Sequence, residues 1–163
     1  MPQEEDDILN QLTAQFPFLA GKVRLQRPRR LWAEVPADKL AEVFEYVVRQ
    51  LGFDVYCTLT GLDMGDKLAA IYHLARANRI VLNLRVELDR QNPCLQTITG
   101  YFPAADISER ELVDLLGVKV EGLPDGPRYP LPDDWPAGSY PLRKDWPGLD
   151  APAGAAQTKP EGS

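Results

Sequence analysis

The chain has 163 residues and a mass of 18.2 kDa, which suits one ordinary domain able to bury a sizeable core without a metal or a disulfide. Hydrophobic residues make up 44% and charged residues 26% of the sequence, and this balance excludes a fully disordered or fibrous protein. The formal net charge of −6 also argues against nucleic acid as a partner, because binding to phosphates needs a basic surface.

The first third of the chain predicts two helices, a basic stretch and a strand. The first helix is expected over residues 8–16 and is ended by Pro17. Residues 21–30 hold five cations, a local exception to the acidic composition, and residues 31–35 are expected to form a strand. From residue 38 to 51 the apolar side chains recur at three- and four-residue spacing, which predicts an amphipathic helix.

Further strands are predicted over residues 53–60, 67–76, 80–88 and 95–101. The clearest is 80–88, where two sets of residues alternate as in a strand with one face on the core and one in water. Residues 77 and 78 suit a tight hairpin between the two strands that flank them. Together the elements predict an α+β domain with a four- or five-stranded, mostly antiparallel sheet and helices packed on one face.

A short helix is expected after this sheet, opening at Ser108 and ending at Gly117. Ser108 and Glu111 have the spacing of a capping box, in which each side chain accepts a hydrogen bond from the backbone N–H of the other residue. Arg110 and Asp114 stand four positions apart and are expected to pair on the exposed side. On local physics alone this segment is a well-capped helix that packs on the domain.

The C-terminal part of the chain is rich in both proline and aromatic residues. Nine of the 15 prolines lie within residues 124–160, and this density prevents regular helices and strand ladders. The tyrosine and tryptophan residues make the same region too apolar for a solvated linker. We therefore expect an α+β domain over residues 1–122, a long proline-rich extension that docks over 123–147, and a flexible tail over 148–163. The extension could pack on its own sheet or on a partner.

The cysteine and histidine counts limit the chemistry of the chain. Cys57 and Cys94 stand far apart in the sequence and cannot form a CxxC pair, although the two thiols could form a disulfide. Zinc sites and iron–sulfur clusters draw several ligands from clustered cysteine and histidine residues, so we expect no metal centre held by this chain alone. The one histidine, His73, lies in an alternating apolar run and is expected to be a strand residue rather than a general base.

The sequence also lacks the usual targeting and phosphate-binding signals. It has no run of 18 apolar residues, and its first seven residues carry four acids and no base, so neither a membrane span nor a secretory signal is expected. Residues 61–66 are glycine-rich but lack the ending of a phosphate-binding loop, and we interpret them as an acidic turn. A cytoplasmic protein that reaches a membrane only through a partner is the expectation.

An ordered set of short motifs in the last third resembles one family. The motifs are Glu109-Arg110-Glu111, Asp114-Leu115-Leu116-Gly117-Val118, Gly122, Pro124-Asp125, Arg128, Pro132-Asp133-Asp134-Trp135 and Pro141-Leu142-Arg143-Lys144-Asp145. Their order resembles that of the 30-kDa subunit of NADH–quinone oxidoreductase, the respiratory complex I, and of the related subunit in energy-converting membrane-bound NiFe hydrogenases. The order of helices and strands before these motifs is similar to that of the family.

The resemblance implies a non-catalytic structural subunit in the peripheral arm of a complex I-like oxidoreductase that passes electrons from NADH or ferredoxin to quinone. Such a subunit has no catalytic, cofactor-binding or metal-binding residue of its own. The implied partners are the NiFe-hydrogenase-like large subunit, which frames the quinone site, and a neighbouring iron–sulfur subunit. Iron–sulfur clusters and quinone, or NiFe, are then expected in those partners. The implied location is peripheral, on the cytoplasmic face of the cell membrane, and the alternative is the equivalent scaffold subunit of a ferredoxin-linked NiFe hydrogenase.

Several motif residues, together with two aromatic residues that flank the last motif, are the candidate partner interface. That interface comprises Glu109, Arg110, Glu111, Asp114, Arg128, Trp135, Tyr140, Leu142, Arg143, Lys144, Asp145 and Trp146. Arg143 could pair with a carboxylate in bidentate fashion, and the aromatic residues are rigid anchors of the kind that dominate interfaces. An internal partner for Arg143, either Asp114 or Glu111, is weighted equally with a partner in another subunit.

Two other classes of function remain from the residues alone. A small-molecule enzyme would act through carboxylates such as Asp63, Asp66 or Asp89 and would need a concave pocket where such groups converge. An independent acidic binding module would instead be a stable, soluble monomer that needs no partner.

Overall fold

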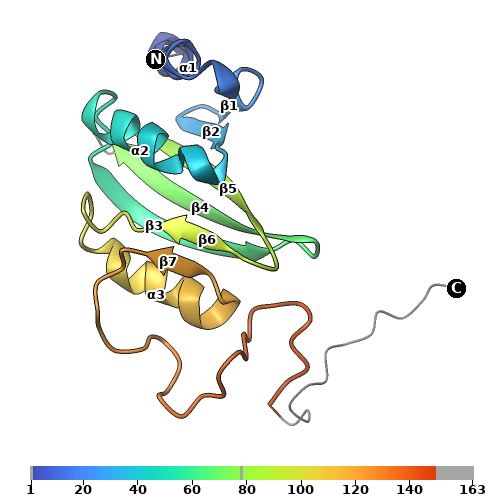
Figure 1. Ribbon diagram of the computed structural model, residues 1–163. Coiled ribbons are helices and arrows are strands. Elements are labelled where there is room, and N and C mark those ends of the chain that lie inside the picture. The colour runs from blue at the N-terminus through green and yellow to red at the C-terminus, as the bar shows by residue number, and fades with distance from the viewer. Residues whose placement is uncertain (1, 78, 150–163) are drawn as a thin grey trace, which may run out of the picture.

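A computed structural model describes residues 2–77 and 79–149 of the chain (Figure 1). Its elements in chain order are α1 (Pro2–Gln15), the 3-10 turn η1 (Pro17–Leu19), β1 (Val23–Arg27), β2 (Arg30–Glu34), the 3-10 turn η2 (Ala37–Lys39), α2 (Leu40–Arg49), β3 (Val55–Asp63), β4 (Lys67–Arg76), β5 (Ile80–Asp89), β6 (Cys94–Gln96), α3 (Ala105–Leu116) and β7 (Lys119–Glu121).

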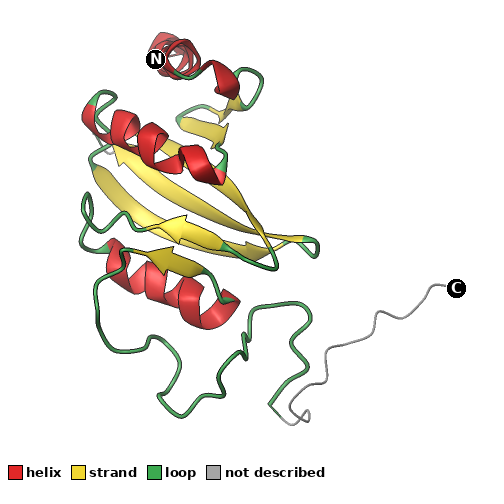
Figure 2. Cartoon of the chain, in the orientation of Figure 1, coloured by secondary structure: helices red, strands yellow, loops and turns green. Residues whose placement is uncertain are grey.

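The main sheet has five strands in the order β1-β2-β5-β4-β3. The pairs β1–β2, β5–β4 and β4–β3 are antiparallel. β2 and β5 are parallel, and α2 and two further strands lie between them in the chain. Strands β6 and β7 form a separate parallel pair. The predicted α+β class with a five-stranded, mostly antiparallel sheet is therefore confirmed, and Figure 2 shows the layer of helices beside the sheet.

The core lies on one face of this sheet. Alternate residues of β5, from Ile80 to Leu88, are all buried, as the period-two pattern predicts. They share one cluster with side chains of all three helices, including Leu12 of α1, Phe44 of α2 and Leu112 of α3. The ring of Phe44 packs edge-on against Tyr72 of β4, with 5.6 Å between the centroids. We call the opposite face of the sheet the open face, since none of these helices lies on it.

The antiparallel pairing of β4 with β5 agrees with the hairpin expected at residues 77 and 78. Ala77 has a left-handed φ of 49°, as a tight connection of two strands requires. Residue 78 lies outside the described residues.

The basic stretch forms a strand that no sequence pattern predicted. β1 pairs with β2 as a hairpin, and four of its five residues are exposed. Only Val23 and Leu25 lie opposite core residues of β2, namely Ala33 and Leu31. The strand has only two alternating apolar residues, Val23 and Leu25, and this pattern is too short to distinguish a strand within a basic stretch.

The predicted strand over residues 95–101 is wrong for most of its length. β6 covers only Cys94–Gln96 and pairs with β7 rather than with the main sheet. After Gln96 the chain departs from strand geometry because the next two residues form hydrogen bonds with α3. The hydroxyl of Thr97 and the backbone N–H of Ile98 both donate to the carboxylate of Glu109.

The helix after this sheet begins earlier than expected and has no capping box. α3 starts at Ala105, its N-cap residue Ala104 makes no side-chain hydrogen bond, and Ser108 lies inside the helix. Its end is as predicted, because Gly117 adopts a left-handed conformation with φ of 69° and closes the helix. Arg110 pairs with Asp106 one turn earlier, and the predicted pair with Asp114 is wrong.

Candidate functional site

The C-terminal segment, residues 123–149, follows the outer side of α3 (Figure 1). It contains no helix or strand, as its proline content predicts. Its backbone and side chains are nevertheless bonded to α3 and to the turn between β3 and β4. Five groups of contacts hold the segment, and each uses residues of the motifs that carry the family resemblance. The described part of the tail predicted over 148–163 is Gly148 and Leu149, and residues 150–163 lie outside the described residues.

The first contact is the pair of Asp114 and Arg128. Asp114 lies on α3 and is 6% exposed, and its carboxylate accepts from Nε of Arg128 at 2.9 Å and from the backbone N–H of Leu131 at 3.2 Å. Arg128 also donates to the carbonyl of Trp135 at 3.1 Å. A buried carboxylate with two donors from the segment is strongly stabilised, so this pair fixes the segment on the helix.

The second contact is a small aromatic cluster inside the segment. The indole N–H of Trp135 donates to the carbonyl of Ser139, and that of Trp146 donates to the hydroxyl of the same serine, each at 2.9 Å. The two indole rings lie 6.0 Å apart. Both side chains are half-buried, so the predicted tryptophan anchors pack on each other and close the segment into a loop.

The third contact places Arg143 at the C-terminal end of α3. Nε of Arg143 donates to the carbonyl of Leu116 at 2.7 Å, and its guanidinium stacks over the ring of Tyr140 at 4.7 Å. Tyr140 in turn covers Gly117 so closely that a Cβ atom there would overlap the ring. Arg143 therefore has an internal acceptor, which is a helix carbonyl and neither of the two predicted acids, and its contact with another subunit stays a prediction.

The fourth contact joins the segment to the β3–β4 turn through Asp63, whose side chain is 2% exposed. Its carboxylate accepts from Arg90 at 2.6 Å, from the backbone N–H of Lys144 at 2.7 Å and from that of Gly65 at 2.8 Å. Burial opposes ionisation of Asp63, but these hydrogen bonds outweigh it and lower its pKa to about 2. Arg90 also pairs with Asp145 at 2.8 Å, and its two carboxylate partners raise its pKa.

The glutamate and arginine of the Glu109-Arg110 motif also have internal partners. Glu109 is 1% exposed, and burial raises its pKa although the hydrogen bonds from Thr97 and Ile98 act in the opposite direction. Arg110 pairs with Asp106 and donates to the carbonyls of Pro124 and Pro127 at 2.6 and 3.3 Å. The two motif residues therefore order the loop before α3 and the start of the C-terminal segment.

A few motif residues, together with Tyr129 beside the motif residue Arg128, face outward from this framework. Leu142 is 56% exposed although its backbone N–H donates to the carbonyl of Leu115. Tyr129 is 43% exposed, Lys144 is exposed, and Glu111 is half-buried. The structure thus brings most of the predicted interface residues together on the outer side of α3, where some hold the segment and others lie on its surface. Glu109 is the exception, because it is buried and faces the loop before α3.

Asp63 and Arg90 complete this site, although the sequence did not reveal their role. Asp63 was a candidate only as a catalytic acid, together with Asp66 and Asp89. It is instead engaged by three donors, and Asp66 and Asp89 are exposed. The signal that could have identified it is an acid directly before the Gly65 turn, where a carboxylate commonly accepts from the backbone two residues later.

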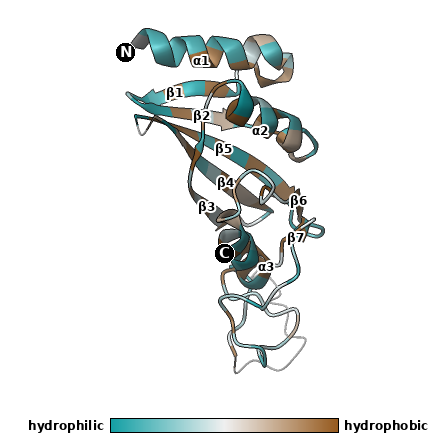
Figure 3. Cartoon of the chain, turned by 90° about the vertical axis from the view of Figure 1, so that its left-hand side faces the viewer, coloured by the Kyte–Doolittle hydropathy of each residue, from teal (hydrophilic) through white to brown (hydrophobic). Residues whose placement is uncertain are grey.

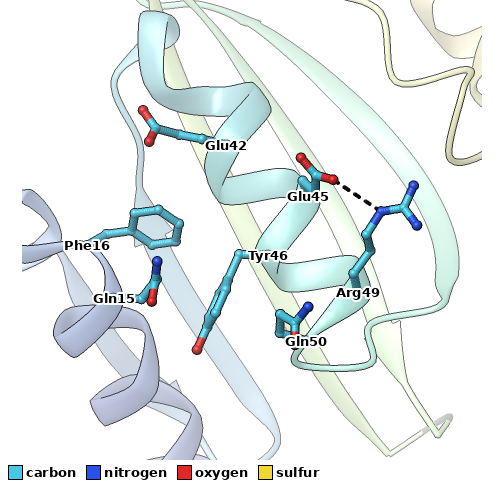
Figure 4. Close-up of a pocket in the computed structure, with 7 residues that line it drawn as sticks. All are labelled: Gln15, Phe16, Glu42, Glu45, Tyr46, Arg49 and Gln50. Carbon is cyan, nitrogen blue, oxygen red and sulfur yellow. Dashed lines mark ion pairs between the residues drawn. The ribbon is translucent and has the colours of Figure 1, made fainter.

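The structure has an open cavity of about 280 Å³ between α1 and α2, away from the C-terminal segment (Figure 4). Its lining is Gln15, Phe16, Glu42, Glu45, Tyr46, Arg49 and Gln50. Figure 4 shows the ion pair of Glu45 and Arg49 on its rim, where both side chains are more than half exposed. None of the three candidate catalytic aspartates lines it.

The described residues offer neither a metal site nor a membrane span. Among residues 2–77 and 79–149, no three His, Cys, Asp or Glu side chains are grouped so that they could hold a metal ion. Within the same ranges, none of the helices has the length and apolar character needed to cross a bilayer.

Residues 33–152 match the family model of the respiratory-chain NADH dehydrogenase 30-kDa subunit. The chain belongs to this family. The match covers most of the main sheet, α2, α3 and the whole C-terminal segment, so it includes the buried carboxylates Asp63 and Asp114 with their partners. The family resemblance inferred from the short motifs is confirmed.

Proteins that are similar to most of this chain come from several kinds of complex. One is a subunit of the F420H2 dehydrogenase of Methanosarcina mazei, 35% identical over 79% of this chain and 86% of its own length. A subunit of the NADH-quinone oxidoreductase of Moorella thermoacetica is 34% identical over 80% of this chain and 88% of its own length. The membrane-bound hydrogenase subunit beta of Pyrococcus furiosus is 29% identical over 80% of this chain and 79% of its own length.

Solved structures share the fold. A chain of the membrane-bound sulfane sulfur reductase, an archaeal respiratory membrane complex, superposes with a TM-score of 0.77 and 26% identity over 88% of this chain and 86% of its own. A trypsin-resistant fragment of Nqo5 gives a TM-score of 0.63 at 23% identity, over 76% of this chain and 99% of the fragment. The family and these relatives make this chain a subunit of a multi-subunit oxidoreductase of the complex I or membrane-bound hydrogenase and sulfane reductase type.

Proposed function

We propose that this chain is a non-catalytic structural subunit of the peripheral arm of a complex I-like membrane-bound oxidoreductase, in which it binds and holds the large subunit. The observation that carries the proposal is the organisation of the C-terminal segment. Buried carboxylates of the domain, Asp63 and Asp114, fix its backbone, and the side chains of Tyr129 and Leu142 stay exposed on the outside. A surface that is already rigid loses little conformational entropy when it binds a partner.

The proposal divides the motif residues by their contacts. Arg128, Arg143 and Asp145 are bonded within the chain, and we infer that they position the segment. Leu142 and Lys144 are exposed near each other in the sequence, and in this proposal they contact the large subunit together with Tyr129. An exposed apolar side chain beside a charged one is typical of an interface with an apolar centre and a polar rim.

Electron transfer then belongs to the neighbouring subunits. In this proposal electrons pass from NADH or ferredoxin to quinone through iron–sulfur clusters of those subunits, and the large subunit frames the quinone site. This chain binds no cofactor, contacts the large subunit and an iron–sulfur subunit, and lies at the cytoplasmic face of the membrane through them.

A substitution of Leu142 by aspartate tests the proposal. The complex is purified from its native host through a tag on this chain, and the amount of co-purified large subunit is measured. Leu142→Asp is expected to lower that amount several-fold, because a carboxylate enters an apolar contact without a partner. Val55→Asp is the matched control, since Val55 is also an exposed apolar residue, at 36%, and lies at the start of β3. Full retention of the large subunit by Leu142→Asp, with an unchanged denaturation midpoint, would contradict the proposal.

A truncation is a poorer test of this interface. Removal of residues 123–149 would also strip the donors from the carboxylates of Asp63 and Asp114, and the domain itself would lose stability. If the large subunit no longer co-purified, the cause would be either unfolding of the domain or the lost contact, and the experiment would not separate the two.

The equivalent scaffold subunit of a ferredoxin-linked membrane-bound NiFe hydrogenase is the second candidate. The similarity to the Pyrococcus furiosus hydrogenase subunit favours it, since the matched shares of both chains are nearly as large as for the quinone reductase relative. The large subunit that co-purifies separates the two candidates, because NiFe ligation requires two pairs of cysteines in that protein. Their presence would support the hydrogenase, and their absence the quinone reductase.

A further inference from the structure

The hairpin of β1 and β2 carries the basic stretch of the sequence, to which the proposed function gives no role. It lies at the upper end of the molecule, and the C-terminal segment lies at the lower end in both views (Figures 1 and 3). β1 is an edge strand of the sheet, and Figure 3 shows it as hydrophilic along most of its length. The hairpin is therefore an exposed charged feature far from the surface described above.

The strand register gathers the cations of this hairpin on one face. Val23 and Leu25 lie opposite core residues of β2, whereas Arg24 lies opposite Trp32 and Arg27 opposite Arg30. Residues paired across two strands share a face, so Arg24, Arg27 and Arg30 lie on the open face of the sheet. Lys22, one residue before Val23, continues the alternation. We name this surface the basic edge and define it as Lys22, Arg24, Arg27 and Arg30.

The basic edge has more positive charge than its surroundings neutralise. Glu34 is the carboxylate of β2 on this face, and it is shared by Arg24 at 3.4 Å and Arg85 at 3.7 Å. Within the described part of the chain, Arg27 and Arg30 form no ion pair. Four cations face one carboxylate, which another arginine also uses. This excess stands out in a chain whose net charge is −6.

The hairpin is held firmly although it is exposed. The carboxylate of Glu5 in α1 is 4% exposed and accepts from the backbone N–H of Arg29, which has a left-handed φ of 65° at the hairpin turn. On the open face, the Arg24 guanidinium lies 5.3 Å from the centre of the Trp32 ring, whose indole N–H donates to Glu34. A surface fixed in this way loses little freedom on binding.

We propose that the basic edge binds a carboxylate-rich surface of a neighbouring protein subunit. Guanidinium groups match carboxylates with two parallel hydrogen bonds, and arginine is enriched at protein interfaces whereas lysine is depleted. Three of the four cations are arginines, and the family works in multi-subunit assemblies. An acidic partner neutralises the excess charge and covers a sheet edge that would otherwise present unpaired backbone groups. The proposal does not depend on what the C-terminal segment contacts, and it gives the chain partner surfaces at both ends.

Zero-length crosslinking in the intact complex tests this inference. A carbodiimide couples an amine to a carboxylate only where the two groups touch. In the unmodified chain Lys22 supplies the amine of the basic edge. The variants Arg27→Lys and Arg30→Lys add amines at two further positions. Arg49→Lys, on the exposed side of α2, is the matched control. Mass spectrometry of the digested complex is expected to show bonds from Lys22 and from the two variant positions to Asp or Glu of another subunit. The control position is expected to show several-fold fewer.

Charge reversal provides an independent measurement on the same complex. Arg27→Glu combined with Arg30→Glu is expected to release a neighbouring subunit at several-fold lower salt than Arg49→Glu combined with Lys119→Glu, which changes the net charge equally. The proposal would be overturned if no crosslinks formed and the salt concentration that releases the subunit did not change. The cations would then serve only to prevent the exposed edge strand from pairing with another sheet. Binding of the isolated full chain to phosphatidylglycerol vesicles that depends on Arg27 and Arg30, with no crosslinks to a subunit, would also overturn it in favour of a lipid surface.

Discussion

The five-stranded sheet and the C-terminal segment are held in place by different interactions. The sheet buries one apolar face beneath three helices, and its central residues on that face, such as Tyr72 and Leu84, are fully buried. The segment keeps its aromatic residues half-exposed and is fixed by hydrogen bonds to the carboxylates of Asp63 and Asp114 and to the carbonyl of Leu116.

This difference teaches how a proline-rich chain can be ordered without strand or helix partners. Its backbone N–H groups and arginine side chains donate hydrogen bonds to acceptors on the folded domain. A small number of acceptor oxygens therefore fixes the position of the segment. The sheet depends instead on the total volume of packed side chains. Changes to packing should therefore affect the whole protein, and changes to the acceptors should affect the segment selectively.

The largest effect is expected in the core. Phe44→Ala removes a ring that is 1% exposed and packs against Tyr72, Tyr101 and Phe102. The cavity and the lost burial should lower the free energy of unfolding by about 4 kcal/mol. Chemical denaturation of the full chain measures this, and both the sheet and the segment should unfold together at lower denaturant. A loss below about 1 kcal/mol would show that the helix layer repacks easily.

A smaller, pH-dependent effect is expected at the acceptor Asp63. Its pKa is about 2 in the folded chain and near 3.8 without its partners, so the ionised form is favoured by folding. The resulting stability, roughly 2 kcal/mol, is present above about pH 4 and is lost as the pH falls toward about 2. Asp63→Asn should remove this part of the pH dependence in denaturation curves and expose the segment to proteases at neutral pH.

The control for Asp63 is its neighbour Asp66, an exposed residue of the same turn. Asp66→Asn should leave both the acid limb of the stability curve and the protease resistance unchanged. Equal behaviour of the two variants would mean that Asp63 does not hold the segment.

The smallest effect, a difference of about 1 kcal/mol between two glycine substitutions, concerns the boundary between α3 and the C-terminal segment. Gly117→Ala introduces a Cβ at a left-handed φ of 69° and against the Tyr140 ring, whereas Gly21→Ala has φ of 75° and nothing within 4 Å. Both should lose about 1 kcal/mol from backbone strain. Gly117→Ala should lose about 1 kcal/mol more and release Tyr140, which the tyrosine fluorescence and proteolysis of the segment would report. Equal losses would show that the ring moves aside without cost.

Patterns of buried and exposed side chains made several parts of this structure predictable. α2 and β5 lie where the apolar periodicity placed them, because that periodicity records which face of each element meets the core. Gly117 as the end of α3 was predictable because few residues other than glycine adopt its backbone conformation easily. The ordered motifs of the last third, together with the fold before them, were enough to identify the family.

Other parts depended on residues that are distant in the sequence. The strand β1 exists because β2 and α1 offer it partners, and its own sequence has only two alternating apolar residues, Val23 and Leu25. The predicted capping box is wrong because α3 begins at Ala105, so that Ser108 lies inside the helix, and the buried contacts of Glu109 reach back to Thr97 and Ile98. Local spacing could not reveal either interaction.

The sequence by itself determined the class of fold, the family and the position of the proline-rich extension, because burial periodicity and proline content act locally along the chain. The tertiary structure alone decided that Asp63, 81 residues before Lys144, accepts from its backbone, and that Asp114 holds Arg128. It also decided that the cations of β1 and β2 share one open face. A charged group's role is set by the partner it meets in space, and sequence spacing does not record that partner.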